Sequence, residues 1–320
     1  MKRIGILTSG GDAPGMNAAI RAAVRTALYH DMEIIGIERG YEGLIEGSFR
    51  GMDLASVGDI LHRGGTVLKT ARSERFMTEE GQLEAMNNLE KCGIEGIIVC
   101  GGDGSYRGAA ELSRRGVPVI GIPGTIDNDM GYTDYTIGYD TAVNTVLDAI
   151  SMLRDTTSSH ERTTILEVMG RDCGDIALYA GLTGGADGIL IPELPVDLDE
   201  LAAKLEEGMA RGKNHSLIIK AEGVDISVEE LKRELDKRTN LDIRTVVLAY
   251  LQRGGSPTAR DRMLATLTAN KAVELLRNDE YGYAVGTVRG EVIKMPLEKA
   301  VAIKREADLY LIPMIDMLSR

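Results

Sequence analysis

Two aspartates near the middle of the chain, Asp127 and Asp129, are the residues whose types and spacing most directly suggest chemistry. They lie in the stretch 121–131, Gly-Ile-Pro-Gly-Thr-Ile-Asp-Asn-Asp-Met-Gly, after an apolar run that is typical of a short buried strand. Ligands of parallel α/β sheets bind beyond the carboxyl ends of strands, where a carboxylate can accept a proton or approach a metal. The stretch alone leaves a second interpretation open, an Asx turn in which the aspartates and Asn128 bond their own backbone.

Further glycine-containing loops share this position directly after an apolar strand. They are expected at 10–12, 101–105, 124–127, 169–171, 222–223 and 252–255. Glycine lets backbone N–H groups close on phosphate oxygens, and a helix that begins directly afterwards adds the positive end of its dipole. One such loop often only makes a turn, but we expect all six at one sheet edge, which indicates a phosphate-binding site. The chain contains no Walker A motif, no protein-kinase glycine loop and no clean G-x-G-x-x-G.

The elements that must position these loops alternate between strand and helix. Strands are expected at 3–7, 33–37, 96–100, 117–122, 163–168, 189–191, 216–221 and 245–251, and helices at 17–29, 83–91, 106–114, 141–154, 175–182, 198–211, 227–238 and 260–276. Residues 41–78 show no clear pattern. This alternation is typical of βαβ units with mostly parallel sheets. At 320 residues, the chain is expected to form two domains of about 150 residues each.

Composition excludes several other classes of protein. The net charge of −12 and the aromatic content of 4%, with no Trp, argue against partners such as nucleic acid or anionic membranes. Three cysteines without a CxxC pair fit reduced thiols better than disulfides or zinc. No apolar run approaches the roughly 20 residues of a membrane span, and the first residues do not form a signal peptide. We therefore expect a cytoplasmic protein.

Five motifs together resemble the bacterial 6-phosphofructokinase family. They are Gly-Gly-Asp-Ala-Pro-Gly-Met-Asn at 10–17, Gly-Gly-Asp-Gly-Ser at 101–105, Pro-Gly-Thr-Ile-Asp-Asn-Asp at 123–129, Met-Gly-Arg at 169–171 and Gln-Arg-Gly-Gly-Ser-Pro at 252–257. The match runs in order over about residues 1–290. The resemblance implies phosphoryl transfer from Mg-ATP to the 1-hydroxyl of fructose 6-phosphate, a reaction of glycolysis.

Pattern and resemblance together predict two Rossmann-like, three-layer α/β domains with mostly parallel sheets and the active site in the cleft between them. The ATP-binding domain is expected at 1–138 and 252–300, and the sugar-phosphate-binding domain at 139–251 and 301–320. The resemblance also implies a homotetramer in which Arg162 and Arg244 come from a neighbouring subunit. Without the resemblance, an exposed arginine next to an acidic residue ordinarily forms only a solvated ion pair with that residue.

The resemblance assigns roles residue by residue. Asp127 matches the catalytic base and Asp129 its supporting carboxylate, and Asp103 matches the Mg²⁺ ligand. Groups around the transferring phosphoryl are Gly11, Thr125 and Arg171. The nucleotide site is expected to comprise Gly11, Tyr41, Arg72, Ser73, Gly102, Asp103, Gly104 and Ser105. The sugar-phosphate site is expected to comprise Thr125, Ile126, Asp127, Arg162, Met169, Gly170, Arg171, Glu222, Arg244, Tyr250, Leu251, Gln252 and Arg253.

Two glycines give information on the phosphoryl donor, and one tyrosine gives information on the sugar-phosphate acceptor. Family members that use pyrophosphate carry bulkier or charged side chains at the positions of Gly104 and Gly124, so glycine at both favours ATP. Tyr250 stands where a histidine usually helps to bind the 6-phosphate, and a phenol is not cationic near neutral pH. The alternatives are a kinase of the same fold with pyrophosphate or another sugar phosphate, and a non-catalytic sugar-phosphate-binding regulatory subunit.

The resemblance also implies an effector pocket for ADP or phosphoenolpyruvate. Its residues would be Arg21, Arg25, Arg154, Gly185, Asp187, Arg211, Lys213 and His215. Arg21 and Arg25 stand four residues apart, a spacing also typical of an ordinary basic helix face. Asp187 replaces the usual Glu and Leu54 the usual arginine. We therefore expect weak allosteric control.

Overall fold

The computed structural model describes residues 1–318, which form two compact units. The first unit comprises Met1–Ile126, Met130–Thr141 and Arg253–Arg305. The second comprises Asp127–Asp129, Ala142–Gln252 and Glu306–Arg320, and its last two residues, which also end the expected sugar-phosphate domain, lie outside the described part. Both units are therefore built from separate segments of the chain. No helix among the described residues is long and apolar enough to cross a membrane.

The first unit is organised around an eight-stranded sheet with the order β12-β11-β5-β4-β1-β2-β3 and β6 paired to β5. Its strands are β1 (Arg3–Ser9), β2 (Glu33–Ile37), β3 (Phe49–Met52), β4 (Gly96–Gly101), β5 (Val119–Thr125), β6 (Ile137–Gly138), β11 (Tyr283–Val288) and β12 (Glu291–Pro296). Only the edge strands β3 and β12 pair antiparallel. The central strands β4 and β5 are buried along their whole length, as expected for apolar runs covered on both faces.

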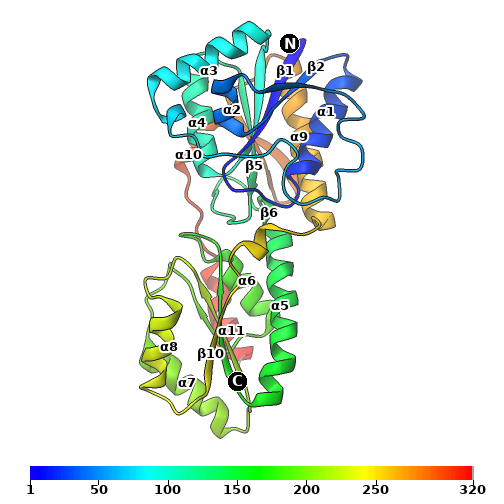
Figure 1. Ribbon diagram of the computed structural model, residues 1–320. Coiled ribbons are helices and arrows are strands. Elements are labelled where there is room, and N and C mark those ends of the chain that lie inside the picture. The colour runs from blue at the N-terminus through cyan, green and yellow to red at the C-terminus, as the bar shows by residue number, and fades with distance from the viewer. Residues whose placement is uncertain (319–320) are drawn as a thin grey trace. The chain divides into compact units, whose positions relative to one another are not determined.

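Helices cover both faces of this sheet, so the unit has three layers (Figure 1). On one face lie α1 (Met16–Tyr29) and α9 (Ala259–Arg277), which pack against each other. On the other lie α2 (Gly40–Glu46), α3 (Glu79–Cys92), α4 (Asp103–Arg114) and α10 (Leu297–Ala302), together with the 3₁₀ turn Arg75–Met77. The expected Rossmann-like, mostly parallel architecture is confirmed.

The second unit is a four-stranded parallel sheet with the order β10-β7-β9-β8. Its strands are β7 (Thr163–Val168), β8 (Gly188–Leu190), β9 (Ser216–Ala221) and β10 (Ile243–Val247). One face carries α7 (Leu198–Ala210) and α8 (Val228–Asp236), and the other carries α6 (Asp175–Gly184) and α11 (Ile312–Leu318) (Figure 1). The helix α5 (Tyr139–His160) begins in the first unit and continues in the second, and a 3₁₀ turn spans Ala249–Arg253.

The structure corrects four expectations about the loops. The six loops do not share one edge, because β1, β4 and β5 belong to one sheet and β7, β9 and β10 to another. Residues 103–105 are not loop but the first turn of α4, since Gly102 already caps that helix. Residues 124 and 125 are the end of β5, where they pair with β6, so the loop begins later. The strand expected at 245–251 ends at 247 because a 3₁₀ turn follows.

Two segments contain helices or strands that the sequence did not predict. Residues 41–78 contain α2 and the antiparallel edge strand β3, and the end of the chain contains the β11–β12 hairpin. These elements are only four to seven residues long, which is too short for a clear apolar periodicity.

Candidate active site

The loops after β1 and β4 lie side by side at the carboxyl edge of the first sheet. The chain passes from β1 to β2 on one side and to β4 on the other, which makes β1/β4 the point where the strand order reverses. In open α/β sheets this point is where phosphate-bearing ligands bind. Gly10 has a φ of 85°, and α4 begins right after Gly102 with its free backbone N–H groups and positive dipole end.

Close approach of other groups explains two of the predicted glycines. A Cβ on Gly11 would lie 1.7 Å from Nη1 of Arg253, so the guanidinium of Arg253 rests against the loop after β1. A Cβ on Gly102 would lie 3.2 Å from Cβ of Thr125, whose own carbonyl accepts a hydrogen bond from Thr136 Oγ1 at 2.7 Å. The edge thus brings Gly11, Gly102, Thr125 and Arg253 together.

The two glycines of the donor argument differ. A Cβ on Gly104 would meet nothing within 4 Å, so this position is open. A Cβ on Gly124 would lie 2.7 Å from Cys100 Sγ and 3.2 Å from Met16 Cε, both core atoms. Gly124 is therefore required by packing inside the unit. The expectation that glycine at both positions leaves space for ATP stays a prediction, and the open position at Gly104 supports it.

Asp103 is the first residue of α4 and pairs with Arg107 one turn later, at 2.7 Å between Oδ2 and Nη2. Its side chain is partly exposed. Among residues 1–318, no group of three or more His, Cys, Asp or Glu side chains is placed to hold a metal ion. A single accessible carboxylate at a phosphate-binding edge nevertheless fits Mg²⁺, which usually binds one or two carboxylates together with substrate phosphates and water.

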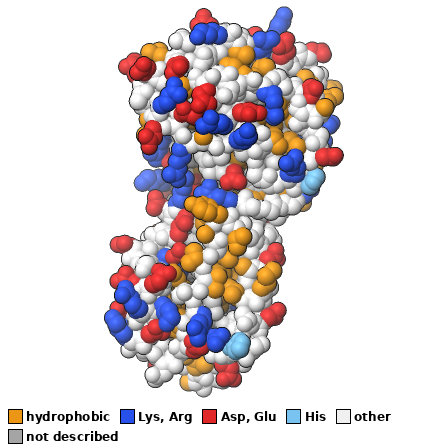
Figure 2. Space-filling view, viewed as in Figure 1, with side chains coloured by type: hydrophobic (Ala, Val, Ile, Leu, Met, Phe, Trp, Pro, Cys, Tyr) orange, Lys and Arg blue, Asp and Glu red, His pale blue; other side chains and the backbone are white. Residues whose placement is uncertain are grey.

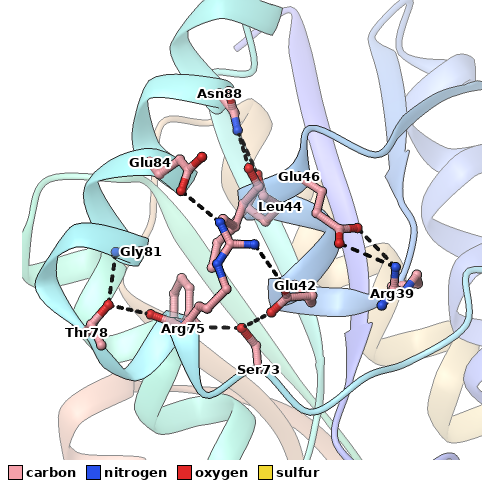
Figure 3. Close-up of polar contacts among 12 residues, drawn as sticks. Arg39, Glu42, Leu44, Glu46, Ser73, Arg75, Thr78, Gly81, Glu84 and Asn88 are labelled. Atoms are coloured by element: carbon pink, nitrogen blue, oxygen red, sulfur yellow. Dashed lines mark hydrogen bonds and ion pairs between the residues drawn. The ribbon is translucent and has the colours of Figure 1, made fainter.

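Of the remaining residues expected at the nucleotide site, Tyr41 lies on α2 and Ser73 contacts that helix. Tyr41 is buried, donates a hydrogen bond to the Ser105 carbonyl at 2.5 Å and stacks on Phe76 with 4.1 Å between ring centroids. Burial raises the pKa of its phenol well above the usual value. Ser73 donates to Glu42 at 2.5 Å and accepts from the Phe76 amide at 3.1 Å (Figure 3). Arg72 is exposed.

In the second unit, Asp127 is 2% exposed, and its Oδ2 lies 3.3 Å from Nε of Arg171. Asn128 has a φ of 54° and donates through Nδ2 to Oδ2 of Asp175 at 2.8 Å, while Asp129 is partly buried. Asn is one of the few residues that adopts this left-handed conformation at low cost. The structure therefore ties the aspartate pair to α6 through the residue between them.

The loop after β7 is shaped by Glu222. Its Oε1 accepts from the amides of Gly170 at 3.3 Å and Arg171 at 2.9 Å. A Cβ on Gly223 would lie 1.9 Å from the Arg171 carbonyl oxygen, so only glycine fits there. Glu222 thus orients the backbone that carries Arg171.

The end of β10 supplies residues of two kinds. Gln252 is fully buried and accepts from the Met169 amide at 3.2 Å, whereas Tyr250 and Leu251 are 78% and 69% exposed.

Arg162 and Arg244 are joined by one carboxylate, Asp242, at 2.8 Å and 3.1 Å. Hydrogen bonds from Arg162 and then Arg244 lower the pKa of Asp242.

The expected effector residues fall in both units. In the second, Asp187 accepts from Lys213 at 2.5 Å and from the Leu217 amide at 2.8 Å. Arg154 donates to the carbonyl oxygens of Gly184 and Gly185 at the end of α6. Arg211 pairs with Glu207, and His215 contacts its neighbour Asn214. Arg21 and Arg25 lie on α1 in the first unit. The exposed Leu54 also belongs to the first unit but lies outside α1.

Sequence reasoning missed the structural roles of Asp175 and Glu42, and it considered Asn128 only as an Asx-turn residue and Asp242 only as the acid beside Arg244. The signal for Asp175 was present, because it opens a predicted helix directly after Gly174. Glu42 gave no signal because it lies in a segment without pattern, and the contact between Asp242 and Arg162 joins residues that are 80 positions apart.

Comparisons with known proteins agree with this arrangement. Residues 3–276 match the phosphofructokinase family model. The chain is 54% identical over 319 residues to the ATP-dependent 6-phosphofructokinase of Clostridioides difficile (strain 630), covering 100% of both chains. It is 55% identical over 312 residues to that of Bacillus subtilis (strain 168), covering 97% of this chain and 98% of the relative. The structure of phosphofructokinase from Saccharomyces cerevisiae has a TM-score of 0.89 at 34% identity, over 100% of this chain and 47% of the yeast chain. The chain therefore belongs to the phosphofructokinase family.

Proposed function

We propose that this chain is an ATP-dependent 6-phosphofructokinase, which transfers the γ-phosphoryl group of Mg-ATP to the 1-hydroxyl of fructose 6-phosphate in glycolysis. The observation that carries the proposal is Asp127, a buried carboxylate beside the guanidinium of Arg171 just beyond β5. The full-length relatives named ATP-dependent 6-phosphofructokinases support both reaction and donor. A protein of glycolysis would work in the cytoplasm.

In this reaction the oxygen of the sugar hydroxyl forms a bond to the γ-phosphorus, and the hydroxyl proton passes to Asp127. The bond between the γ-phosphorus and the bridging oxygen breaks, and that oxygen leaves with ADP. Arg171, Thr125 and the backbone at Gly11 stabilise the charge that spreads over the transferring phosphoryl. Asp129 supports the base. Asp103 would hold Mg²⁺, which neutralises the phosphate charge when bound. Arg107 keeps the Asp103 carboxylate in place at 2.7 Å.

We assign nucleotide binding to the first unit and sugar-phosphate binding to the second. The strand-order reversal at β1/β4 and the open position at Gly104 support the first assignment. The assignment of sugar-phosphate binding is supported by the loop of Gly170 and Arg171 and by Arg162 and Arg244, since guanidinium groups bind phosphate well.

We further propose a homotetramer in which Arg162 and Arg244 complete the sugar-phosphate site of a neighbouring subunit. Exposed Val247, Tyr250 and Leu251 at the end of β10 give this part of the second unit apolar surface. Hydrophobic side chains also gather on the face of this unit visible in Figure 2. Large exposed apolar patches commonly mark subunit contacts.

Effector control by ADP or phosphoenolpyruvate is proposed to be weak. Lys213 is neutralised by Asp187, and Arg211 by Glu207, so fewer cationic groups are available for a phosphate. Leu54 adds no charge. A large shift of the fructose 6-phosphate saturation curve on adding either effector would contradict this.

The test is a coupled assay of fructose 1,6-bisphosphate formation, with fructose 6-phosphate titrated against Mg-ATP and, in parallel, Mg-pyrophosphate. Turnover with ATP alone is expected, and the half-saturation point reports what Tyr250 does to substrate binding. Turnover with pyrophosphate would favour the other donor. Absence of turnover with both would indicate another sugar phosphate or a non-catalytic regulatory subunit.

A further inference from the structure

The segment 70–76 carries Arg72, which is expected at the nucleotide site of the proposed enzyme. At its start, Thr70 donates through Oγ1 to the Gly10 carbonyl at 2.7 Å. At its end, the ring of Phe76 stacks on Tyr41. Arg72 itself is exposed, and within residues 1–318 no hydrogen bond or ion pair fixes its guanidinium. The place at which Arg72 leaves the backbone therefore depends on what holds the middle of the segment.

One carboxylate, that of Glu42 on α2, holds the middle. Oε2 accepts from Ser73 Oγ at 2.5 Å, and Oε1 accepts from Arg75 Nη1 at 3.0 Å (Figure 3). Ser73 in turn accepts from the Phe76 amide, which closes the turn. The two oxygens of Glu42 thus bind Ser73, which directly follows Arg72, and Arg75, three residues after Arg72.

Arg75 also pairs with a second acidic residue, so the effect of a shielded partner can be compared with that of an exposed one. Glu84 on α3 contacts the other side of Arg75 at 3.0 Å, but its side chain is 52% exposed against 14% for Glu42. Ion pairs in solvent contribute little, whereas charge-assisted hydrogen bonds to a shielded carboxylate are stronger. The Ser73 hydrogen bond, followed by Arg75, lowers the pKa of Glu42, so the carboxylate is ionised near neutral pH.

We propose that Glu42 is a positioning residue for the ATP site: through Ser73 and Arg75 it fixes the segment 70–76 on α2 and thereby fixes where Arg72 meets the nucleotide. Ser73 donates its hydroxyl hydrogen bond to Glu42. It therefore acts by holding the segment on α2 rather than by donating to a phosphate. This inference rests on the proposed function, which supplies the nucleotide.

The test compares full-length wild-type enzyme with Glu42→Ala, Glu42→Gln and two matched controls. Glu84→Ala removes the exposed partner of the same arginine, and Glu46→Ala removes an acid of the same helix that pairs with Arg39 instead. Glu42→Ala is expected to raise the KM for Mg-ATP about five- to tenfold, because charge-assisted hydrogen bonds that position the site are lost. The kcat and the half-saturation for fructose 6-phosphate should change less than about twofold, since the reacting groups stay in place.

Hydrogen exchange of the ligand-free enzyme gives a readout independent of turnover. Amides in 72–77 are expected to exchange at least about tenfold faster in Glu42→Ala, because the turn closed by Ser73 opens more often. Glu42→Gln keeps an acceptor for Ser73 and should show a smaller change in both measurements. The two controls should match the wild type within about twofold in KM.

An unchanged KM for Mg-ATP and unchanged exchange in a folded Glu42 variant would overturn the proposal, as would an equal effect of Glu84→Ala. If Glu42→Ala does not fold, Glu42→Gln decides by the same two measurements. If the wild type lacks turnover, the proposed function fails separately. Calorimetric titration with Mg-ATP and the exchange rates then still decide whether Glu42 positions a nucleotide site.

Discussion

Asp127 is almost completely shielded from solvent, and a buried carboxylate without compensation would favour its neutral form. The guanidinium of Arg171 at 3.3 Å supplies that compensation. The proposed catalytic base must be ionised to accept a proton, and a neighbouring guanidinium favours that form. Arg171 holds a left-handed conformation with φ of 53°, which Glu222 stabilises through two backbone hydrogen bonds.

Asp127→Asn is expected to lower kcat by about 10²–10⁴, the usual contribution of a general base, with little change in the KM for Mg-ATP. The amide keeps the shape of the side chain but cannot accept the proton. Steady-state kinetics of the purified variant measure both constants. Asp172→Asn, an exposed acid beside Arg171, is the matched control and should leave kcat unchanged. Unchanged turnover in Asp127→Asn would refute the assignment of the base.

At the scale of elements, the packing of β5 on β4 and α1 depends on a missing side chain. Gly124 in β5 lies against Cys100 of β4 and Met16 of α1, all inside the first unit. Interiors packed to this density tolerate few added atoms. The strand that leads to Asp127 and Asp129 is therefore positioned by close packing contacts.

Gly124→Ala is expected to lower the free energy of unfolding by about 1–3 kcal/mol, because its methyl group overlaps Cys100 Sγ. Gly104→Ala, where a methyl group meets open space in α4, should leave stability unchanged or slightly raised, since alanine favours helix. Urea unfolding of both variants measures the difference. Adding Cys100→Ala to Gly124→Ala should recover part of the loss. Equal stability of the two single variants would contradict this packing.

A second link joins α9 to the start of α5. Asp261 is buried, and its carboxylate accepts from the amides of Gly138 and Thr141, each at 2.8 Å, and from Thr141 Oγ1. Burial raises the pKa of Asp261 from 3.8 to about 6, and the nearby charge of Asp140 adds to the rise. The folded state therefore holds this proton more tightly than the unfolded chain.

The sign of the resulting pH dependence follows from linkage. Stability from this group is fully present below pH 3.8 and is lost as the pH rises to about 6. Relative to Asp261→Asn, which does not titrate, the wild type should lose about 2 kcal/mol of unfolding free energy between pH 4 and 7. Urea unfolding across this range, with both proteins compared at each pH, measures it. A difference that stays constant with pH would show that Asp261 does not titrate there.

At the scale of the whole molecule, Arg162 and Arg244 gather on Asp242 in a partly exposed cluster of the second unit. One carboxylate between two guanidinium groups leaves net positive charge. Such charge is well suited to a phosphate brought by another subunit, as the proposed tetramer requires.

Mixing two inactive variants tests this sharing. Asp127→Asn lacks the base, and the double variant Arg162→Ala with Arg244→Ala lacks the proposed trans arginines. Subunits mixed in equal amounts by reversible dissociation should regain about a quarter of the wild-type activity, because symmetry then gives some sites both intact halves. Mixing each variant with itself is the control. No recovery despite exchange of subunits would place the arginines in the site of their own chain.

The sequence alone determined the alternation of strands and helices and the glycine motifs that follow β1, β4, β7 and β9. Apolar runs such as 163–168 and 216–221 match β7 and β9 residue for residue, because burial on both faces leaves a clear local signal. The motifs also identified the aspartate pair and the family before any contact was known.

Only the tertiary structure decided which loops share an edge and what holds each functional group. Division into two sheets depends on strand pairing between distant segments, which periodicity does not encode. The filled space at Gly124 and the links of Glu42, Asp175 and Asp242 likewise join residues far apart in the chain. Residue types reveal which chemistry is available locally, whereas the geometry that makes it usable arises from non-local packing.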